Sequence, residues 1–313
     1  MRTATHRLLE RERRLAFWML LPAFAVVAAL VAFPVVWNFW LSLKPVLLAD
    51  LRGRSLFEFN LTLANFRQVL SDPGFGSVLL TTLVYTVGGS ALSILLGLAA
   101  ALLVREEFPG RAFVRGLLIS PDIAPVVAVT FTWSFILDPQ LGVVNWLALE
   151  QGLIRAPIPF LTGHWIEVAG WGETWRLPLA LLAVIFFEGW RYFPFAFLFI
   201  LARLQGIPEE IYHAAAVDGA SPVQRFIHIT LPQLATVLAT LFLFRFIWTI
   251  NKFDDIFLLT RGQAGTEVIT LRIYDYAFGE FNIGAGSAAA VILFGILSAF
   301  LTVYFCWILR EAE

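Results

Sequence analysis

The chain has 313 residues, of which 59% are hydrophobic and 14% are charged, with a formal net charge of −1 and a mean hydropathy of +0.79. A soluble domain cannot bury so much apolar surface, so this composition excludes a soluble globular protein and favours a membrane protein. The net charge is uninformative, and we expect no nucleic-acid partner. Cys306 is the only cysteine, which excludes a disulfide framework and a CxxC metal or redox motif.

Six long apolar stretches follow one another along the chain. Residues 16–43, 77–104 and 286–309 contain no Asp, Glu, Lys or Arg, and each is longer than the roughly 20 residues that cross a bilayer core. Three further stretches are interrupted by few charges: residues 116–137, 177–201 and 230–250. We therefore predict an all-α fold of six transmembrane helices in one membrane domain over residues 1–313. The unbroken lengths exclude a transmembrane β-barrel.

Two prolines, Pro121 and Pro125, lie near the start of the third stretch. Transmembrane helices tolerate proline because neighbouring helices compensate for the lost backbone hydrogen bond. We expect kinks that the surrounding helices absorb.

The distribution of positive charge predicts the orientation in the membrane. The two termini and the connections 105–115 and 202–229 carry 11 Lys and Arg in 58 positions, and the connections on the opposite side carry 9 in 107. Cytoplasmic connections are the ones enriched in Lys and Arg. We therefore expect both termini in the cytoplasm and an uncleaved first helix.

The connection 203–234 carries the most informative pattern, that of a polar two-helix hairpin between two apolar stretches. Pro208 suits the first position of a helix, and Gly219 can end that helix. Ser221 and Gln224, on either side of a proline, form a capping-box signal for a second helix. An ordinary amphipathic connector is the alternative interpretation.

This hairpin resembles the EAA loop of binding-protein-dependent ABC importers, the cytoplasmic element of the permease that docks into the ATPase. The matching residues are Ala214, Ala215, Asp218, Gly219, Ile229, Leu231 and Pro232. The glutamate of the family element falls on His213 in this chain. The resemblance implies that the coupling residues are Glu209, Glu210, His213, Ala214, Ala215, Asp218 and Gly219.

The rest of the chain is similar to sugar permeases of the maltose and glycerol-phosphate type. The similarity is carried by Leu-Leu-Pro-Ala at 20–23, by the segment 63–75 and by the segment 251–262. It points to the larger subunit of the maltose-type pair, without that subunit's extra helices or large external domain. The resemblance implies a type I importer permease fold, a place in the bacterial or archaeal inner membrane, and half of a carbohydrate pathway.

Ionisable residues inside membrane spans are costly and default to functional hypotheses. Glu188 and Arg191 are three apart and could pair on one helical face. Arg245, Trp248, Thr249 and Lys252 recur at helical spacing, and sugar sites combine an aromatic platform with polar groups. The family positions add Tyr192. The predicted substrate site therefore comprises Glu188, Arg191, Tyr192, Trp248, Thr249 and Lys252.

These residues also have structural interpretations. Glu188 and Arg191 could form a buried ion pair that fixes helix packing, and Trp248 could belong to an interfacial aromatic belt. If the substrate is anionic, Arg191, Arg245 and Lys252 are the natural counter-charges, and a glycerol-phosphate-like compound is the better assignment.

No phosphate-binding GxxxxGK[ST] motif occurs, so we expect no ATP and no other cofactor in this chain. The four histidines are scattered, so we assign no metal. The resemblance implies a non-enzymatic permease with four kinds of partner: a second homologous permease, two ATPase subunits, an external substrate-binding protein and the lipid bilayer. The alternatives are an ion-coupled secondary transporter, an ABC permease for glycerol phosphate and a non-transporting membrane scaffold.

Overall fold

The computed structural model describes residues 2–52, 59–170 and 173–311, and it divides into two compact units. One unit combines Met1–Phe75 with Arg272–Glu313, and the other comprises Gly76–Leu271. The prediction of one membrane domain over residues 1–313 stays a prediction.

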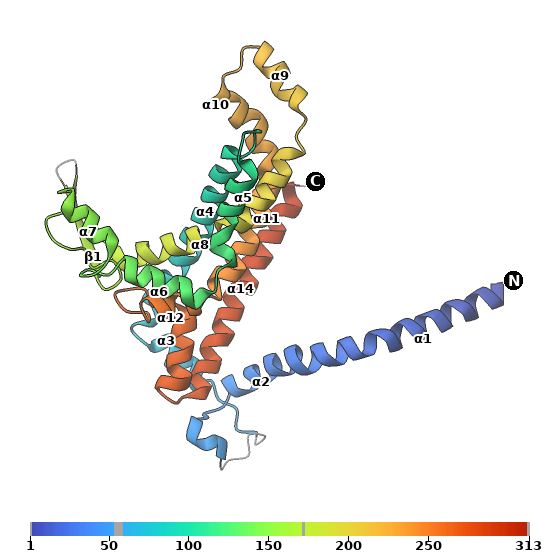
Figure 1. Ribbon diagram of the computed structural model, residues 1–313. Helices are drawn as coiled ribbons and strands as arrows, with labels where there is room; N and C mark the ends of the chain where they lie inside the picture. Colours follow the sequence, from blue (N-terminus) through green and yellow to red (C-terminus); the bar gives the residue numbers. More distant parts are fainter. Residues whose placement is uncertain (1, 53–58, 171–172, 312–313) are drawn as a thin grey trace. The chain divides into compact units, whose positions relative to one another are not determined.

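The first unit joins the two ends of the chain (Figure 1). Helix α14 packs against α2 and α3, and Asn65 of α3 donates to the carbonyls of Ser42, at 2.9 Å, and Lys44, at 2.7 Å. Its helical elements are α1 (Arg2–Val27), η1 (Ala28–Ala32), α2 (Phe33–Ser42), η2 (Leu48–Arg52), α3 (Ala64–Ser71), η4 (Asp275–Gly279) and α14 (Ile283–Glu311).

The second unit contains the predicted substrate residues and the hairpin. Its elements are α4 (Phe75–Leu103), α5 (Arg111–Ile123), α6 (Val126–Ile136), α7 (Val143–Glu150), β1 (Trp165–Gly170), β2 (Glu173–Pro178), α8 (Leu179–Gln205), α9 (Glu209–Val217), α10 (Pro222–Arg225), η3 (Phe226–Thr230), α11 (Leu231–Ile250) and α12 (Asp254–Leu259). Helix α13 (Ile269–Tyr274) crosses the boundary between the units.

The all-α fold class is confirmed. Among the described residues, five helices are long and apolar enough to span a membrane, and a bent pair at the third predicted position brings the number to six. The antiparallel hairpin of β1 and β2 was not predicted, and it pairs Trp165 with Pro178 at one end and Gly170 with Glu173 at the other.

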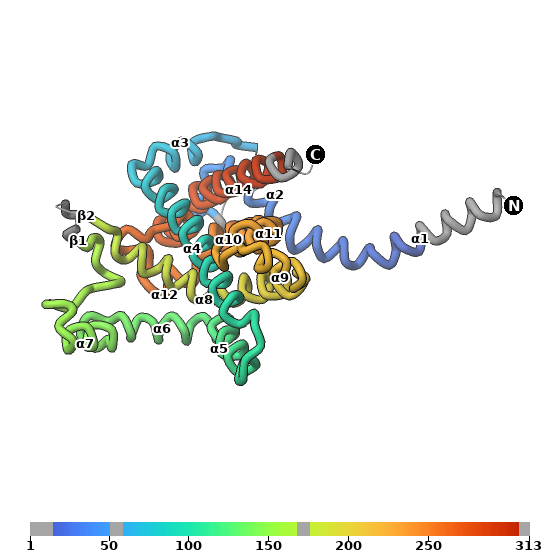
Figure 2. Tube along the Cα trace, turned by 90° about the horizontal axis from the view of Figure 1, so that it is seen from above, coloured from blue at the N-terminus to red at the C-terminus, as the bar shows by residue number. Residues whose placement is uncertain are grey.

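The third span is broken. Helices α5 and α6 meet at a bend of 97°, and Figure 2 shows them running in different directions. Ala124 at the break is extended, with φ −67° and ψ 142°, as expected for a residue before proline. Pro125 also lacks an N–H group, so it donates no backbone hydrogen bond across the break. The expectation of an absorbed kink was therefore wrong.

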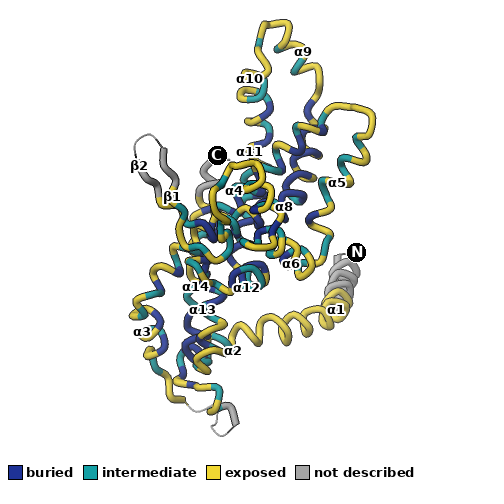
Figure 3. Tube along the Cα trace, turned by 60° about the vertical axis from the view of Figure 1, so that its left-hand side comes forward, coloured by how far each residue is buried: buried dark blue, intermediate teal, exposed yellow. Residues whose placement is uncertain are grey.

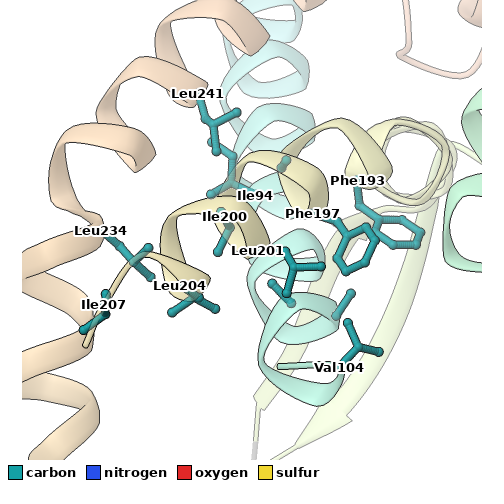
Figure 4. Packing of buried hydrophobic residues seen from close by; sticks show 13 residues of the cluster. Ile94, Val104, Phe193, Phe197, Ile200, Leu201, Leu204, Ile207, Leu234 and Leu241 are labelled. Carbon is teal, nitrogen blue, oxygen red and sulfur yellow. The ribbon is translucent and has the colours of Figure 1, made fainter. Parts of the chain in front are cut away.

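Helix α8 is the central helix of the second unit. In its most apolar window 61% of the residues are buried, compared with 39% in α4 and 22% in the span that contains α11. Figure 4 shows Ile200 and Leu204 of α8 in the apolar cluster that also contains Ile94 of α4 and Leu234 of α11. This packing fixes the positions of the polar side chains farther along the same three helices.

We expect Gly97→Ala to destabilise the protein, because a Cβ atom there would lie 2.7 Å from Cβ of Ala196 and 2.8 Å from the backbone nitrogen of Phe197. Overpacking of this kind costs about 1–3 kcal/mol. Gly116→Ala is the matched control, since a Cβ atom on that helical glycine meets nothing within 4 Å. The melting temperature in detergent should fall for Gly97→Ala alone, and equal melting temperatures would contradict the close approach of α4 and α8.

Candidate functional site

Glu188 lies in the middle of α8 and is fully buried. Its Oε1 accepts hydrogen bonds from Arg245 Nη2 at 2.5 Å and from Thr249 Oγ1 at 2.9 Å. Its Oε2 accepts from the hydroxyl of Tyr85 at 3.0 Å. A Cβ atom on Gly89 of α4 would lie 2.7 Å from Cγ of Glu188, so the glycine provides the space for this carboxylate. Both oxygens of Glu188 are therefore occupied by protein groups.

Arg245 of α11 is the buried partner of Glu188. Its Nε donates to Ser93 Oγ at 3.2 Å, and its guanidinium lies 4.7 Å from the centre of the Tyr192 ring. The prediction that Glu188 pairs with Arg191 was wrong. Arg245 reaches Glu188 across the packing of α8 and α11, whereas Arg191, on the same helix as Glu188, is directed to the break in the third span.

Arg191 binds the two carbonyl oxygens next to the break between α5 and α6. Its Nη1 donates to the carbonyl of Pro121 at 3.2 Å, and its Nη2 donates to that of Ala124 at 2.8 Å. The last carbonyls of a helix lack partners within the helix, and at membrane depth such groups must be satisfied by protein. Arg191 therefore stabilises the broken span, and its Nε also donates to the Tyr192 hydroxyl at 3.2 Å.

Tyr192 connects Arg191 to the end of α11. Its hydroxyl accepts a hydrogen bond from Lys252 and donates to Asp255 Oδ2 at 3.1 Å. Lys252 and Asp255 form an ion pair at 3.2 Å, and the ammonium group lies 3.8 Å from the centre of the Tyr192 ring. Asp255 is fully buried, and its Oδ1 has no hydrogen-bond partner among the described residues.

Five of the six predicted substrate residues belong to this connected polar network, which we call the α8–α11 network. Trp248 is the exception, with 46% of its surface exposed. Its ring packs against Phe195, at a centroid distance of 4.9 Å, and is stacked with Phe244 at 5.8 Å. The five network residues are Glu188, Arg191, Tyr192, Thr249 and Lys252.

Sequence reasoning missed three members of the network, Tyr85, Ser93 and Asp255. Asp255 carried a usable signal, because it lies three residues after Lys252, a spacing at which side chains meet on a helical turn. Tyr85 and Ser93 lie far from Glu188 in the sequence, and nothing in the sequence pairs them with it.

The predicted hairpin is present at the opposite end of α8. Gly219 has a φ of +84° and ends α9, and the backbone N–H of Ala220 donates to the carbonyl of Ala215 at 2.9 Å. The capping box is present, since the Ser221 N–H donates to Gln224 Oε1 at 2.7 Å and the Gln224 N–H donates to Ser221 Oγ at 3.3 Å. Pro208 occupies the N-cap, one position before the first helical residue.

The sequence predicted a second short helix in the hairpin, but this helix is not separate. Helix α10 continues through η3 into α11, which gives one apolar span from Pro222 to Ile250. Figure 3 shows most of α9 and α10 in the colour of exposed residues. Ala215 is half-buried, and the other predicted coupling residues are exposed, namely Glu209, Glu210, His213, Ala214, Asp218 and Gly219.

A groove of about 410 Å³ lies beside the Gly219 turn. Its lining combines small, polar and basic residues, namely Ala215, Asp218, Gly219, Ala220, Gln224, Arg225, His228 and Ile229. Within the described part of the chain, no group of three or more His, Cys, Asp or Glu side chains is placed to hold a metal ion.

Comparisons with known proteins agree on one family. The family described as binding-protein-dependent transport system inner membrane component matches residues 93–310. The chain is 33% identical over 284 residues to the inner membrane ABC transporter permease protein YcjO of Escherichia coli (strain K12), covering 91% of this chain and 90% of YcjO. It is 31% identical over 304 residues to the trehalose/maltose transport system permease protein MalF of Thermococcus litoralis, covering 96% and 95%.

The fold is also similar to solved structures. A chain from a bacterial ABC transporter involved in the import of the acidic polysaccharide alginate matches with a TM-score of 0.76 and 21% identity, over 98% of this chain and 100% of that one. A second structure of a bacterial alginate transporter, in complex with a periplasmic protein bound to an alginate pentasaccharide, matches with a TM-score of 0.75 and 22% identity, over 95% and 96%.

We expect Glu188→Gln to destabilise the protein strongly, because it leaves the buried guanidinium of Arg245 without its counter-charge. Breaking a buried ion pair costs about 3–5 kcal/mol, and the double variant Glu188→Gln/Arg245→Met should cost less than the sum of the single variants. Glu167→Gln is the control, because its bond to Arg176 is exposed and such pairs contribute about 0–1 kcal/mol. The melting temperature in detergent is measured for Glu188→Gln, Arg245→Met, the double variant and Glu167→Gln. A Glu188→Gln protein as stable as the wild type would contradict the structural role of the Glu188–Arg245 pair.

Proposed function

Because this chain belongs to the family of binding-protein-dependent transport system inner membrane components, we propose that it is one permease subunit of an ATP-driven importer that moves a sugar into the cytoplasm. The relative from T. litoralis is named for trehalose and maltose transport, which supports a sugar of similar size as the cargo. These relatives lend no support to an ion-coupled transporter or to a glycerol-phosphate permease.

One structural observation carries the proposal. The helix from Pro222 to Ile250 begins at the exposed hairpin and ends in the α8–α11 network, where Arg245 and Thr249 contact Glu188. A partner that moves the hairpin can therefore act directly on the buried polar residues through a single helix. Tyr212 of α9 also bonds to Thr230 of this span, at 2.9 Å, and Arg203 of α8 donates to the carbonyl of Gln233, at 3.1 Å.

The proposed partners follow from this arrangement. The sequence contains no phosphate-binding loop, so ATP binds to two separate ATPase subunits, which take the exposed hairpin. A second permease subunit supplies the other half of the pathway. An external protein delivers the sugar, as the complex of the alginate transporter with its periplasmic protein suggests by analogy. Both termini lie in the cytoplasm, because the Lys and Arg density is higher on that side.

In the proposed cycle, closure of the ATPase subunits moves α9 and α10 and switches access to the sugar from outside to inside. Trp248 provides an aromatic face for the C–H groups of the sugar, to which the partly exposed ring of Tyr192 adds, and the partly exposed ammonium group of Lys252 provides a hydrogen bond for a hydroxyl group. Glu188, Arg191 and Thr249 hold the helices around this surface, because their polar atoms are already bonded within the protein.

We expect Trp248→Ala to lower sugar uptake about tenfold or more, the factor that ~1.4 kcal/mol of lost interaction produces. Trp248→Phe should retain most of the uptake because it keeps an aromatic face. Trp146→Ala, which removes an exposed tryptophan of α7, is the matched control. Uptake of labelled trehalose and maltose into cells at equal expression measures the effect. Normal uptake by Trp248→Ala would remove this residue from the pathway.

We expect Gly219→Leu to weaken coupling to the ATPase subunits. Its φ of +84° costs a side-chain-bearing residue about 1–2 kcal/mol, and the leucine adds bulk to the docking surface. Gly152→Leu is the matched control, because it has a φ of +67° and free space but lies in a different loop. Co-purification of the ATPase subunits and substrate-stimulated ATP hydrolysis should fall only in Gly219→Leu. Equal behaviour of the two variants would count against the hairpin as the coupling element.

A further inference from the structure

Three positively charged side chains of the α8–α11 network lie at or beneath the proposed surface for the sugar: Arg191, Arg245 and Lys252. On sequence alone these residues are the natural counter-charges for an anionic substrate. In the structure, each of these cations is bonded to a carboxylate or to backbone carbonyl oxygens of the protein. On the basis of the proposed function, we infer that the transported sugar is electrically neutral and that Asp255 enforces this selectivity by neutralising Lys252.

Arg245 cannot serve an anionic substrate without losing its partner. Its side chain is 2% exposed, and it is bonded to Glu188 at 2.5 Å, to Ser93 and to Thr249. An incoming carboxylate or phosphate would have to replace Glu188, and Glu188 would then be left buried as an unpaired charge. The Glu188–Arg245 pair is therefore neutral as a unit toward any substrate.

Arg191 donates its hydrogen bonds to the protein backbone. It is 4% exposed, and its guanidinium holds the carbonyl oxygens of Pro121 and Ala124 at the end of α5. The C-terminal end of a helix carries partial negative charge, which a nearby cation compensates. Drawing Arg191 away to a substrate anion would leave the carbonyls of the break without donors at membrane depth.

Lys252 is the most accessible of the three cations, with 20% of its side chain exposed, and it is the one that an anion would meet. Asp255 Oδ2 lies 3.2 Å from its ammonium group, and the Tyr192 hydroxyl also accepts from it. The second oxygen of Asp255, Oδ1, receives no hydrogen bond from the described residues, so no other group competes with Lys252 for the charge of this carboxylate. An incoming anion would have to displace Asp255 from the ammonium group and leave a buried carboxylate without its counter-charge.

A neutral sugar meets no such obstacle. A hydroxyl group can accept a hydrogen bond from the ammonium group of Lys252, which has three donors, while the ion pair stays intact. The exposed Trp248 ring offers a face that suits neutral C–H surfaces. The same groups that resist an acid therefore accept an uncharged carbohydrate.

The test uses the complete importer in proteoliposomes with its external binding protein, and it measures ATP hydrolysis stimulated by four probes. Trehalose and maltose are the neutral probes, and an alginate-type uronic-acid disaccharide and glycerol 3-phosphate are the anionic ones. We expect the neutral probes to stimulate hydrolysis at concentrations at least tenfold lower. An equal or better response to the uronic-acid disaccharide would overturn the inference while the proposed transport of a sugar stands, and a preference for glycerol 3-phosphate would overturn both. A lack of response to every carbohydrate tested would remove the proposed function, and the inference with it.

A variant then assigns the selectivity to Asp255. Asp255→Asn removes the counter-charge of Lys252, so the detergent-solubilised importer should bind the uronic-acid disaccharide at least tenfold more tightly than the wild type in calorimetry. Asp254→Asn, a change of the exposed neighbouring carboxylate, should leave this affinity unchanged. Equal affinities of the wild type and the Asp255→Asn variant would remove Asp255 as the selective residue. If Asp255→Asn fails to assemble, the comparison of the four probes on the wild type still decides whether the cargo is neutral.

Discussion

The ion pair between Glu188 and Arg245 is the interaction on which the second unit depends. Two opposite charges on α8 and α11 meet at 2.5 Å inside an apolar helix bundle, where either charge alone would be very costly. The pair requires the glycine at position 89, a hydroxyl from each of two other positions on α4, and Thr249 to complete its hydrogen bonds. Its geometry therefore fixes three helices relative to one another, and the aromatic ring of Tyr192 links it to the Lys252 pair.

This arrangement changes the meaning of the charged residues in the spans. A charged residue inside a membrane protein is first a candidate for substrate contact, but here most of the charged side chains are paired with other groups of the protein. What is left for a ligand is a partly exposed surface of one ammonium group, one phenol and one indole. Such a surface is suited to shape and hydroxyl recognition, and the buried network beneath it keeps that surface in place.

Much of the fold could be predicted from the sequence because its signals are local. Charge-free stretches are long enough to locate the spans, and the caps at Gly219 and Ser221 act on their own neighbours in the chain. The break in the third span was underestimated because Pro125 also required a partner for the freed carbonyls, and that partner, Arg191, lies on another helix. The predicted pairing of Glu188 with Arg191 was wrong for the same reason. The spacing of the two residues allowed a bond, but tertiary packing places Arg245, from another helix, next to Glu188. The spacing of Asp255 to Lys252 was a usable local signal that was overlooked, whereas its contact with Tyr192 across the bundle had no signal in the sequence.

The two membrane helices with π-helical turns share a further feature. The turn Ala28–Ala32 ends two residues before Pro34, and the turn Phe226–Thr230 ends two residues before Pro232. A proline leaves one carbonyl of the preceding turn without its donor, and a widened turn accommodates this without a break. The widened turn also inserts one residue, which rotates everything beyond it by about 100°. A helical wheel drawn through Pro222–Ile250 at constant pitch therefore misplaces one half against the other. The face that the capped end presents to a docking partner is therefore turned by about 100° from the position that a regular helix would give it relative to Arg245.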